Sequence, residues 1–142
     1  MKRRILLVDD DLAVLLTLKA VLELHGFEVD TASGTSEALK RLEAGAYHMV
    51  ISDLRMETEA AGMEVIRAAQ RQSYDPATAL LTAFPPHEAN GKEQPESMLV
   101  KPIGTEDLVR KIEVLLIQHA DRRQLRERNP AAHTLQRHRP AS

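Results

Sequence analysis

Residues 5–11 read Ile-Leu-Leu-Val-Asp-Asp-Asp, four apolar residues followed directly by three acids. A short, uninterrupted apolar run is typical of a strand in a parallel sheet that helices cover on both faces. In such sheets, the residues that carry out chemistry gather where the strands end. The stretch therefore predicts a buried first strand with acidic side chains at its carboxyl end.

Further apolar runs alternate with helical patterns along the rest of the chain. We expect more strands at about 27–32, 49–51, 79–82 and 98–100, and helices at about 12–25, 36–44, 61–72 and from 105 onward. Gly26 stands where a helix C-terminal cap is expected, and Ser33, Thr35 and Ser36 are candidate N-caps for the second helix. This alternation predicts an α/β fold with five parallel strands.

The segment between the fourth and fifth expected strands is rich in helix-breaking residues. Residues 84–97 contain Pro85, Pro86, Gly91 and Pro95. Proline and glycine in a helix interior cost stability, so they limit any helix there to a turn or two. We therefore expect the fourth helix to be short or disordered.

The chain is long enough for one domain, and its charge divides unevenly. Of its 142 residues, residues 1–118 carry a net charge of −6 and residues 119–142 a net charge of +4. We expect one domain over residues 1–118, then a helix extension and a basic, disordered tail over residues 119–142. The tail lacks interleaved aromatic residues and a helix-turn-helix pattern, which favours a solvated tail over a nucleic-acid-binding segment. No DNA-binding domain is expected.

The lack of cysteine fits a reducing compartment, and the sequence contains no expected membrane segment. The sequence has no cysteine, so disulfides and thiolate metal sites are excluded. The histidines, His119 among them, show no metal-ligand spacing, so we expect them at the surface or in the tail. The basic start, Met1-Lys2-Arg3-Arg4, precedes an apolar run that Asp9 interrupts too early for a signal peptide or a spanning helix. We expect a cytoplasmic protein.

Polar residues stand at the ends of four expected strands. They are Asp9, Asp10 and Asp11, then Asp53, Thr82 and Lys101. Clustered carboxylates repel one another unless a cation neutralises them, and oxygen ligands suit Mg²⁺. A carboxylate beside Mg²⁺ can attack a phosphoryl group, and a lysine and a hydroxyl can stabilise the charge that develops. The pattern therefore favours phosphoryl chemistry.

Four segments resemble the response-regulator receiver family of two-component signalling, which includes CheY-like proteins. They are Ile-Leu-Leu-Val-Asp-Asp-Asp at 5–11, Val-Ile-Ser-Asp-Leu at 50–54, Leu-Leu-Thr-Ala at 80–83 and Leu-Val-Lys-Pro at 99–102. The likeness covers about residues 3–118. It implies a flavodoxin-like, doubly wound sheet in the order 2-1-3-4-5. It also implies a phosphoacceptor switch that a sensor histidine kinase or a histidine phosphotransfer protein phosphorylates and that controls an unknown downstream protein.

The resemblance also implies roles for particular residues. The phosphoacceptor is Asp53, the Mg²⁺ ligands are Asp9, Asp10, Asp53 and the backbone carbonyl of Arg55, and the residues that contact the phosphoryl group are Thr82 and Lys101. Asp11 has no such role and is expected to cap the first helix. Such a protein is a switch and not a classical enzyme, because it catalyses only its own Mg²⁺-dependent phosphorylation and dephosphorylation.

Each of these residues alone also has an ordinary structural interpretation. An Asp after a strand is commonly a helix cap, a lone Thr is often a plain turn or strand residue, and a lone Lys is often solvated. The loop after Asp53 lacks the proline usual in the family, and Met98 stands where the family has Tyr or Phe. These departures keep open an interaction module that is not phosphorylated. A haloacid-dehalogenase-like phosphatase with Asp9 as nucleophile is the other alternative.

Overall fold

A five-stranded sheet forms the centre of the molecule. The computed structural model describes residues 2–83, 97–100 and 104–128. The strands are β1 (Arg4–Val8), β2 (Glu28–Ala32), β3 (Met49–Asp53), β4 (Ala77–Thr82) and β5 (Ser97–Val100). All neighbouring strands are parallel, and their order is β2-β1-β3-β4-β5. The expected α/β fold and strand order are therefore confirmed, although β4 begins two residues earlier than predicted.

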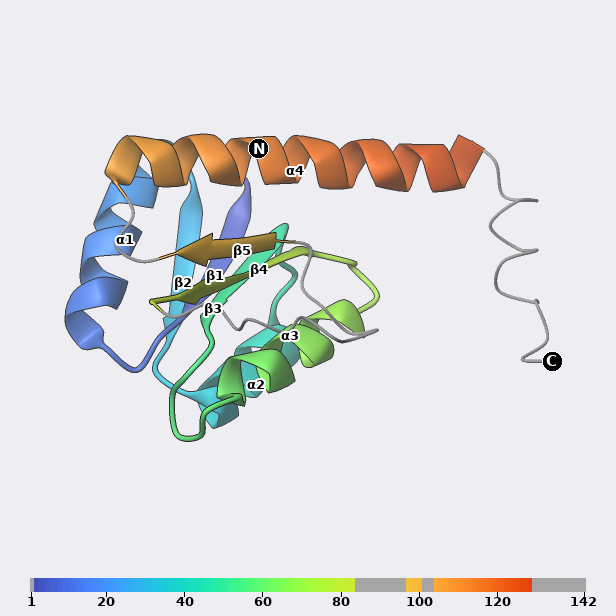
Figure 1. The fold of residues 1–142 in the computed structure, drawn as a ribbon. Coiled ribbons are helices and arrows are strands. Elements are labelled where there is room, and N and C mark those ends of the chain that lie inside the picture. Colours follow the sequence, from blue (N-terminus) through green and yellow to red (C-terminus); the bar gives the residue numbers. More distant parts are fainter. Residues whose placement is uncertain (1, 84–96, 101–103, 129–142) are drawn as a thin grey trace, which may run out of the picture.

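Helices cover both faces of this sheet, as the apolar strands predict (Figure 1). On one face lie α1 (Leu12–Leu24) and α4 (Thr105–Arg128), and on the other lie α2 (Thr35–Ala44) and α3 (Ala61–Gln70). The expected short fourth helix falls on residues 84–96, outside the described residues, so the label α4 belongs to the helix that follows β5. It crosses position 118 without interruption and ends at Arg128. The predicted tail, residues 129–142, is also outside the described residues.

Alternating side chains of the strands divide the core into two layers. Ile5 and Leu7 of β1 pack toward α1 and α4, whereas Leu6 and Val8 pack toward α2 and α3. All four are buried, which explains why β1 reads as an unbroken apolar run and not as an alternating one. Among the described residues there is no helix whose length and hydropathy would let it cross a bilayer.

Both ends of α1 are capped by the residues that the sequence predicts. The Asp11 carboxylate accepts hydrogen bonds from the backbone N–H groups of Ala13 (3.0 Å) and Val14 (3.3 Å), so its predicted capping role is confirmed. At the other end, Gly26 has a φ of +91°, which an L side chain rarely adopts. Its N–H bonds to the carbonyl of Glu23, and the Phe27 N–H bonds to that of Leu22. This is a Schellman cap, and it turns the chain directly into β2.

The N-terminus of α2 is capped differently from the prediction. Its N-cap residue is Gly34, which makes no side-chain cap, so the prediction that Ser33, Thr35 or Ser36 caps this helix is wrong. The Glu57 carboxylate accepts from the Thr35 N–H at 3.2 Å instead. Hydrogen bonding with Thr35 lowers the pKa of Glu57. A carboxylate from a distant loop thus supplies the negative group that the helix N-terminus favours.

Candidate functional site

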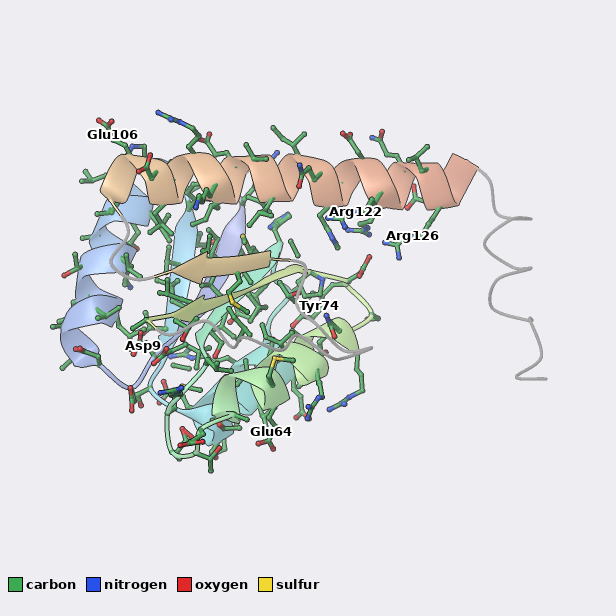
Figure 2. The ribbon with its side chains drawn as sticks, viewed as in Figure 1. Asp9, Glu64, Tyr74, Glu106, Arg122 and Arg126 are labelled. Atoms are coloured by element: carbon green, nitrogen blue, oxygen red, sulfur yellow. The ribbon has the colours of Figure 1, made fainter. Side chains whose placement is uncertain are left out.

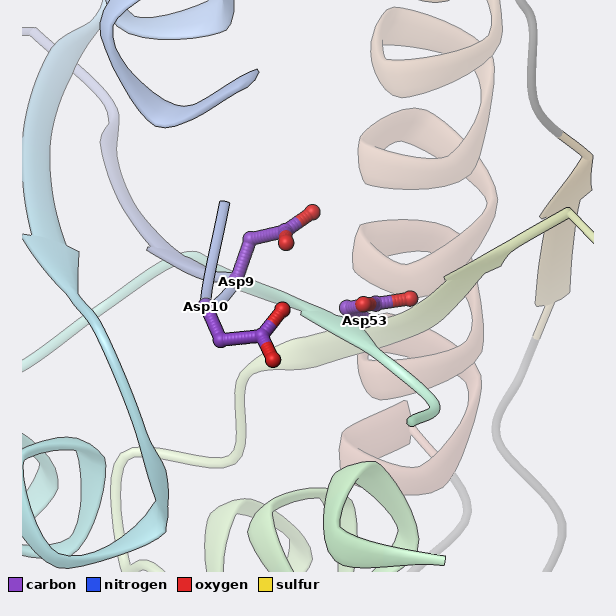
Figure 3. Close-up of side chains that lie close together, drawn as sticks. All are labelled: Asp9, Asp10 and Asp53. Carbon is purple, nitrogen blue, oxygen red and sulfur yellow. The ribbon is translucent and has the colours of Figure 1, made fainter. Parts of the chain in front are cut away.

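Three carboxylates meet at the carboxyl edge of the sheet (Figure 3). Asp9, Asp10 and Asp53 each present an oxygen that lies within 4.8 Å of those of the other two. Asp9 is 2% exposed and Asp53 9% exposed, whereas Asp10 is exposed to solvent. The expected acidic cluster is therefore present, with two nearly buried members and one that faces solvent.

Sheet register explains why residues so far apart in sequence meet here. In the parallel pairing of β1 with β3, Val8 lies beside Ser52, so the next residues along the two strands are Asp9 and Asp53. The Asp9 carboxylate also accepts a hydrogen bond of 2.9 Å from the Asp11 N–H, which fixes its orientation at the start of α1. A shift of register by one residue would separate the carboxylates and turn the strand's side chains to the opposite face.

Thr82 is placed at the same edge by the neighbouring strand. Asp53 pairs with Leu81 on β4, so Thr82 lies one position further along, and its side chain is 2% exposed. The predicted lysine, Lys101, directly follows β5 but lies outside the described residues. Arg55, whose backbone carbonyl is the remaining predicted metal ligand, lies two residues beyond β3 with an exposed side chain.

The cluster fits a small divalent cation. At an effective dielectric constant of about 20, two unit negative charges at this separation repel by roughly 3–4 kcal/mol. A cation held between them would remove this repulsion, and three carboxylate oxygens with an open side toward solvent match the oxygen ligands and retained waters that Mg²⁺ prefers. The residues present therefore fit Mg²⁺.

Close packing below the cluster depends on a residue that the sequence analysis did not single out. Gly62, in the first turn of α3, donates its N–H to the Leu54 carbonyl at 2.8 Å. A Cβ at this position would overlap the backbone carbonyl oxygen of Asp53 and approach the Leu54 Cα to 2.7 Å. Only glycine lets α3 begin this close to the end of β3. A glycine nine residues after a strand-end Asp is the only sequence signal for it.

The sequence matches the response regulator receiver domain family over residues 5–113. The chain belongs to this family. A CheY-like receiver domain from Methanospirillum hungatei JF-1 has a similar structure, with a TM-score of 0.78 and 26% identity over 86% of this chain and 99% of that one. The response regulator TrrA from Thermotoga maritima, solved in complex with Mg²⁺–BeF, gives a TM-score of 0.69 and 33% identity over 80% of this chain and 98% of that one.

Curated relatives of this receiver domain are longer proteins. The transcriptional regulatory protein PrrA of Mycobacterium leprae is 32% identical over 116 residues, which is 80% of this chain and 49% of PrrA. The chain thus spans about half the length, or less, of the first curated relatives that it matches. The family match therefore identifies a receiver domain of the response-regulator type.

Proposed function

We propose that this receiver domain accepts a phosphoryl group on Asp53 from a sensor histidine kinase or a histidine phosphotransfer protein, and that its altered conformation controls a downstream protein. The observation that carries the proposal is the placement of Asp53, nearly buried, within 4.8 Å of the Asp9 and Asp10 oxygens. Such an arrangement suits a carboxylate that must react beside a bound cation.

Asp53 is the nucleophile of the proposed reaction. One of its carboxylate oxygens attacks the phosphorus of a phosphohistidine, and an acyl phosphate forms on Asp53 as the phosphorus–nitrogen bond breaks. The donor imidazole leaves with the electron pair of that bond and takes up a proton. Attack of water on the same phosphorus later restores the carboxylate and releases inorganic phosphate, so the switch resets itself.

The neighbouring residues hold and stabilise the phosphoryl group in this proposal. Asp9, Asp10 and the backbone carbonyl of Arg55 would hold Mg²⁺ together with Asp53, and bound Mg²⁺ neutralises negative charge on the phosphoryl oxygens. The complex of Thermotoga maritima TrrA with Mg²⁺–BeF supports this ligand chemistry for a relative. Lys101 forms an ion pair with the phosphoryl group, and the Thr82 hydroxyl donates a hydrogen bond to it.

Movement of Thr82 toward the phosphoryl group would carry the signal into the adjoining strands. Met98 on β5 is partly buried against Ile66 and Leu80, together with Met63. A flexible thioether can follow such a movement by changing rotamer, with a smaller change of exposed surface than an aromatic ring would give. We assign the phosphoacceptor unit to residues 1–118 and an extension to residues 119–142, and place the protein in the cytoplasm.

Asp53→Asn tests the proposal directly. Incubation of the protein with Mg²⁺ and acetyl phosphate should add the mass of one phosphoryl group to the intact chain, and the variant should gain none. Asp121→Asn is the matched control, because Asp121 is an exposed carboxylate on α4. The control should be modified as fully as the original protein.

Two results would contradict the proposal. If the original chain gains no phosphoryl group from acetyl phosphate or from a phosphorylated histidine phosphotransfer domain, the fold serves as an interaction module without phosphorylation. If Asp53→Asn is modified as well as the control, the acceptor is another residue.

A further inference from the structure

The amino-terminal edge of the sheet, opposite the three carboxylates, contains a pocket of about 420 Å³. This volume lies within the range of small-molecule sites. The basic and aromatic residues that line it are Arg3, Tyr47, His48, Tyr74, His119 and Arg123. Two arginines, two histidines and two aromatic rings therefore surround one pocket, and nothing in the phosphoacceptor site uses them.

The C-terminal part of α4 forms one wall of this pocket because Asp75 anchors it. The Asp75 carboxylate lies 2.9 Å from an Arg126 guanidinium nitrogen and 3.7 Å from the Arg123 Nε. His119, which is 9% exposed, hydrogen-bonds through Nε2 to the Asp75 carbonyl at 2.7 Å. Arg122 and Arg126 extend from the underside of α4 toward the region of Tyr74 (Figure 2). The sequence prediction that His119 is a surface or tail residue is therefore wrong.

Hydrogen-bond donors in the pocket outnumber the acceptors. The Nδ1 of His48 accepts a hydrogen bond of 2.9 Å from the Arg4 N–H, so the ring proton is on Nε2. Within the part of the chain that the structure describes, neither this Nε2–H nor the Arg3 guanidinium has a hydrogen-bond or ion-pair partner. Asp75 is the one carboxylate among the residues that line the pocket, and Arg126 and Arg123 already pair with it.

Positively charged side chains gather around His48. The pKa of His48 is lowered, first by burial and then by the positive charges of Arg3, Arg123 and Arg4. Burial and these neighbouring charges both disfavour a further positive charge at this position. Tyr47 is buried at 4% exposure, with the Arg4 guanidinium over its ring at 5.0 Å. Tyr74 is partly buried and donates its hydroxyl to the Leu42 carbonyl, so its ring is the apolar surface that the pocket offers.

Several of these groups lie outside the segment that the family shares. The family match covers residues 5–113, whereas Arg3, Leu116, His119, Ala120 and Arg123 of the lining lie before or after it. The pocket therefore depends on Arg3, just before β1, and on the long α4 of this chain, and not on the phosphoacceptor site.

We propose that this pocket binds a small organic anion, with a carboxylate or phosphate group held by Arg3, His48 and Arg123 and a flat apolar part against the ring of Tyr74. An anion would supply the acceptors that the pocket lacks and would pair with Arg3. Such a ligand would also bridge the strand ends to α4, because its partners come from both.

Benzoate is a suitable probe, with inorganic phosphate and benzylammonium for comparison. We expect saturable changes in the backbone amide signals of ¹⁵N-labelled protein, confined to residues 46–48, 74–75 and 116–123, when benzoate is added at constant ionic strength. Benzylammonium has the same ring and the opposite charge, and it should produce no such changes. Benzyl phosphate distinguishes a preference for phosphate from one for carboxylate, and either anion supports the proposal.

Paired substitutions test which side chains bind the anion. Arg3→Gln combined with Arg123→Gln should weaken benzoate binding by at least about tenfold, since each change removes a charged donor. Arg110→Gln combined with Lys111→Gln removes the same charge from exposed positions on α4 and should leave the affinity unchanged. Both pairs are at the surface, and unchanged amide signals elsewhere would show that the fold is retained.

Three outcomes would overturn the proposal: no saturable benzoate shifts at these residues, equal shifts with benzylammonium, or equal affinity in the Arg3→Gln/Arg123→Gln protein. Binding of inorganic phosphate without benzoate would overturn the assignment of an organic anion. Phosphorylation of Asp53 is measured separately, so neither proposal depends on the other.

Discussion

Gly62 illustrates how much at the site depends on a single missing side chain. Asp53 and Leu54 leave no room for a Cβ at this position, because the first turn of α3 lies directly on their backbone. The reason for this glycine is the close approach of two backbones. The two ordinary signals for a required glycine, a positive φ and a turn sequence, do not apply to it.

Gly62→Ala should destabilise the fold by about 1–3 kcal/mol, because relieving the overlap requires a backbone shift. The same shift would displace Asp53, so phosphorylation should slow as well. Urea denaturation and the rate of phosphoryl uptake measure the two effects. Gly104→Ala is the control, since among the described residues a Cβ there meets only the Asp107 carboxylate, at 3.7 Å, and should cause a smaller loss of stability. Equal stability of the two variants would contradict this account.

Single residues differed in how well the sequence predicted them. Asp9, Asp10 and Asp53 were predictable because the carboxyl ends of parallel strands converge, whatever the loops do. Asp11 was predictable because capping is local. The cap that Glu57 provides for α2 was not, because it joins residues 22 positions apart through the shape of a loop. The same holds for the contact of His119 with Asp75.

At the scale of elements, α4 owes its position to two kinds of contact. Leu108, Ile112 and Leu116 pack into the core beneath the first half of the helix. Beyond them, the contacts are polar and converge on Asp75, whose φ of 49° is unusual for a residue other than glycine. Asn and Asp tolerate this conformation better than other non-glycine residues. The spacing of apolar residues therefore predicted the first half of α4. No sequence pattern predicted the contacts with Asp75 that hold its second half.

Asp75→Asn removes the negative charge at this position but leaves the backbone conformation accessible, because Asn also adopts positive φ. We expect amide hydrogen exchange to quicken over residues 119–128, with a loss of about 1 kcal/mol in global stability, since the carboxylate is partly exposed and its ion pairs are screened. Exchange over residues 105–116 should change little. Asp121→Asn removes an exposed carboxylate of the same helix and should leave exchange unaltered. If residues 119–128 are equally protected in both variants, the charge does not anchor the helix.

For the whole molecule, the carboxylate cluster that could bind a cation lowers the stability of the metal-free fold. Three acids within 4.8 Å burden the metal-free fold with repulsion that a bound cation would remove. The elements around them were predictable because apolar runs and helical spacing are local signals, and the strand order followed from the resemblance. The pocket at the opposite edge was not, because it combines residues from four separate parts of the chain.

Asp10→Asn should raise the free energy of unfolding of the metal-free protein by about 1 kcal/mol, because it removes one of the clustered charges. Mg²⁺ at about 100 times its dissociation constant should stabilise the original protein by about 2.7 kcal/mol, and the variant by much less. Urea denaturation with a chelator and with Mg²⁺ measures both changes. Asp121→Asn should behave like the original protein, and equal stabilisation of Asp10→Asn by Mg²⁺ would exclude Asp10 as a ligand.

The direction of α4 decides where its C-terminal end lies relative to Asp53. With 24 residues, the helix spans about 36 Å. It starts shortly after β5 and ends where Arg126 contacts Asp75, at the edge of the sheet remote from Asp53 (Figure 1). The C-terminal end of α4 therefore lies on the far side of the domain from Asp53. Core contacts in its first half and contacts with Asp75 in its second half hold the helix against the domain along this path.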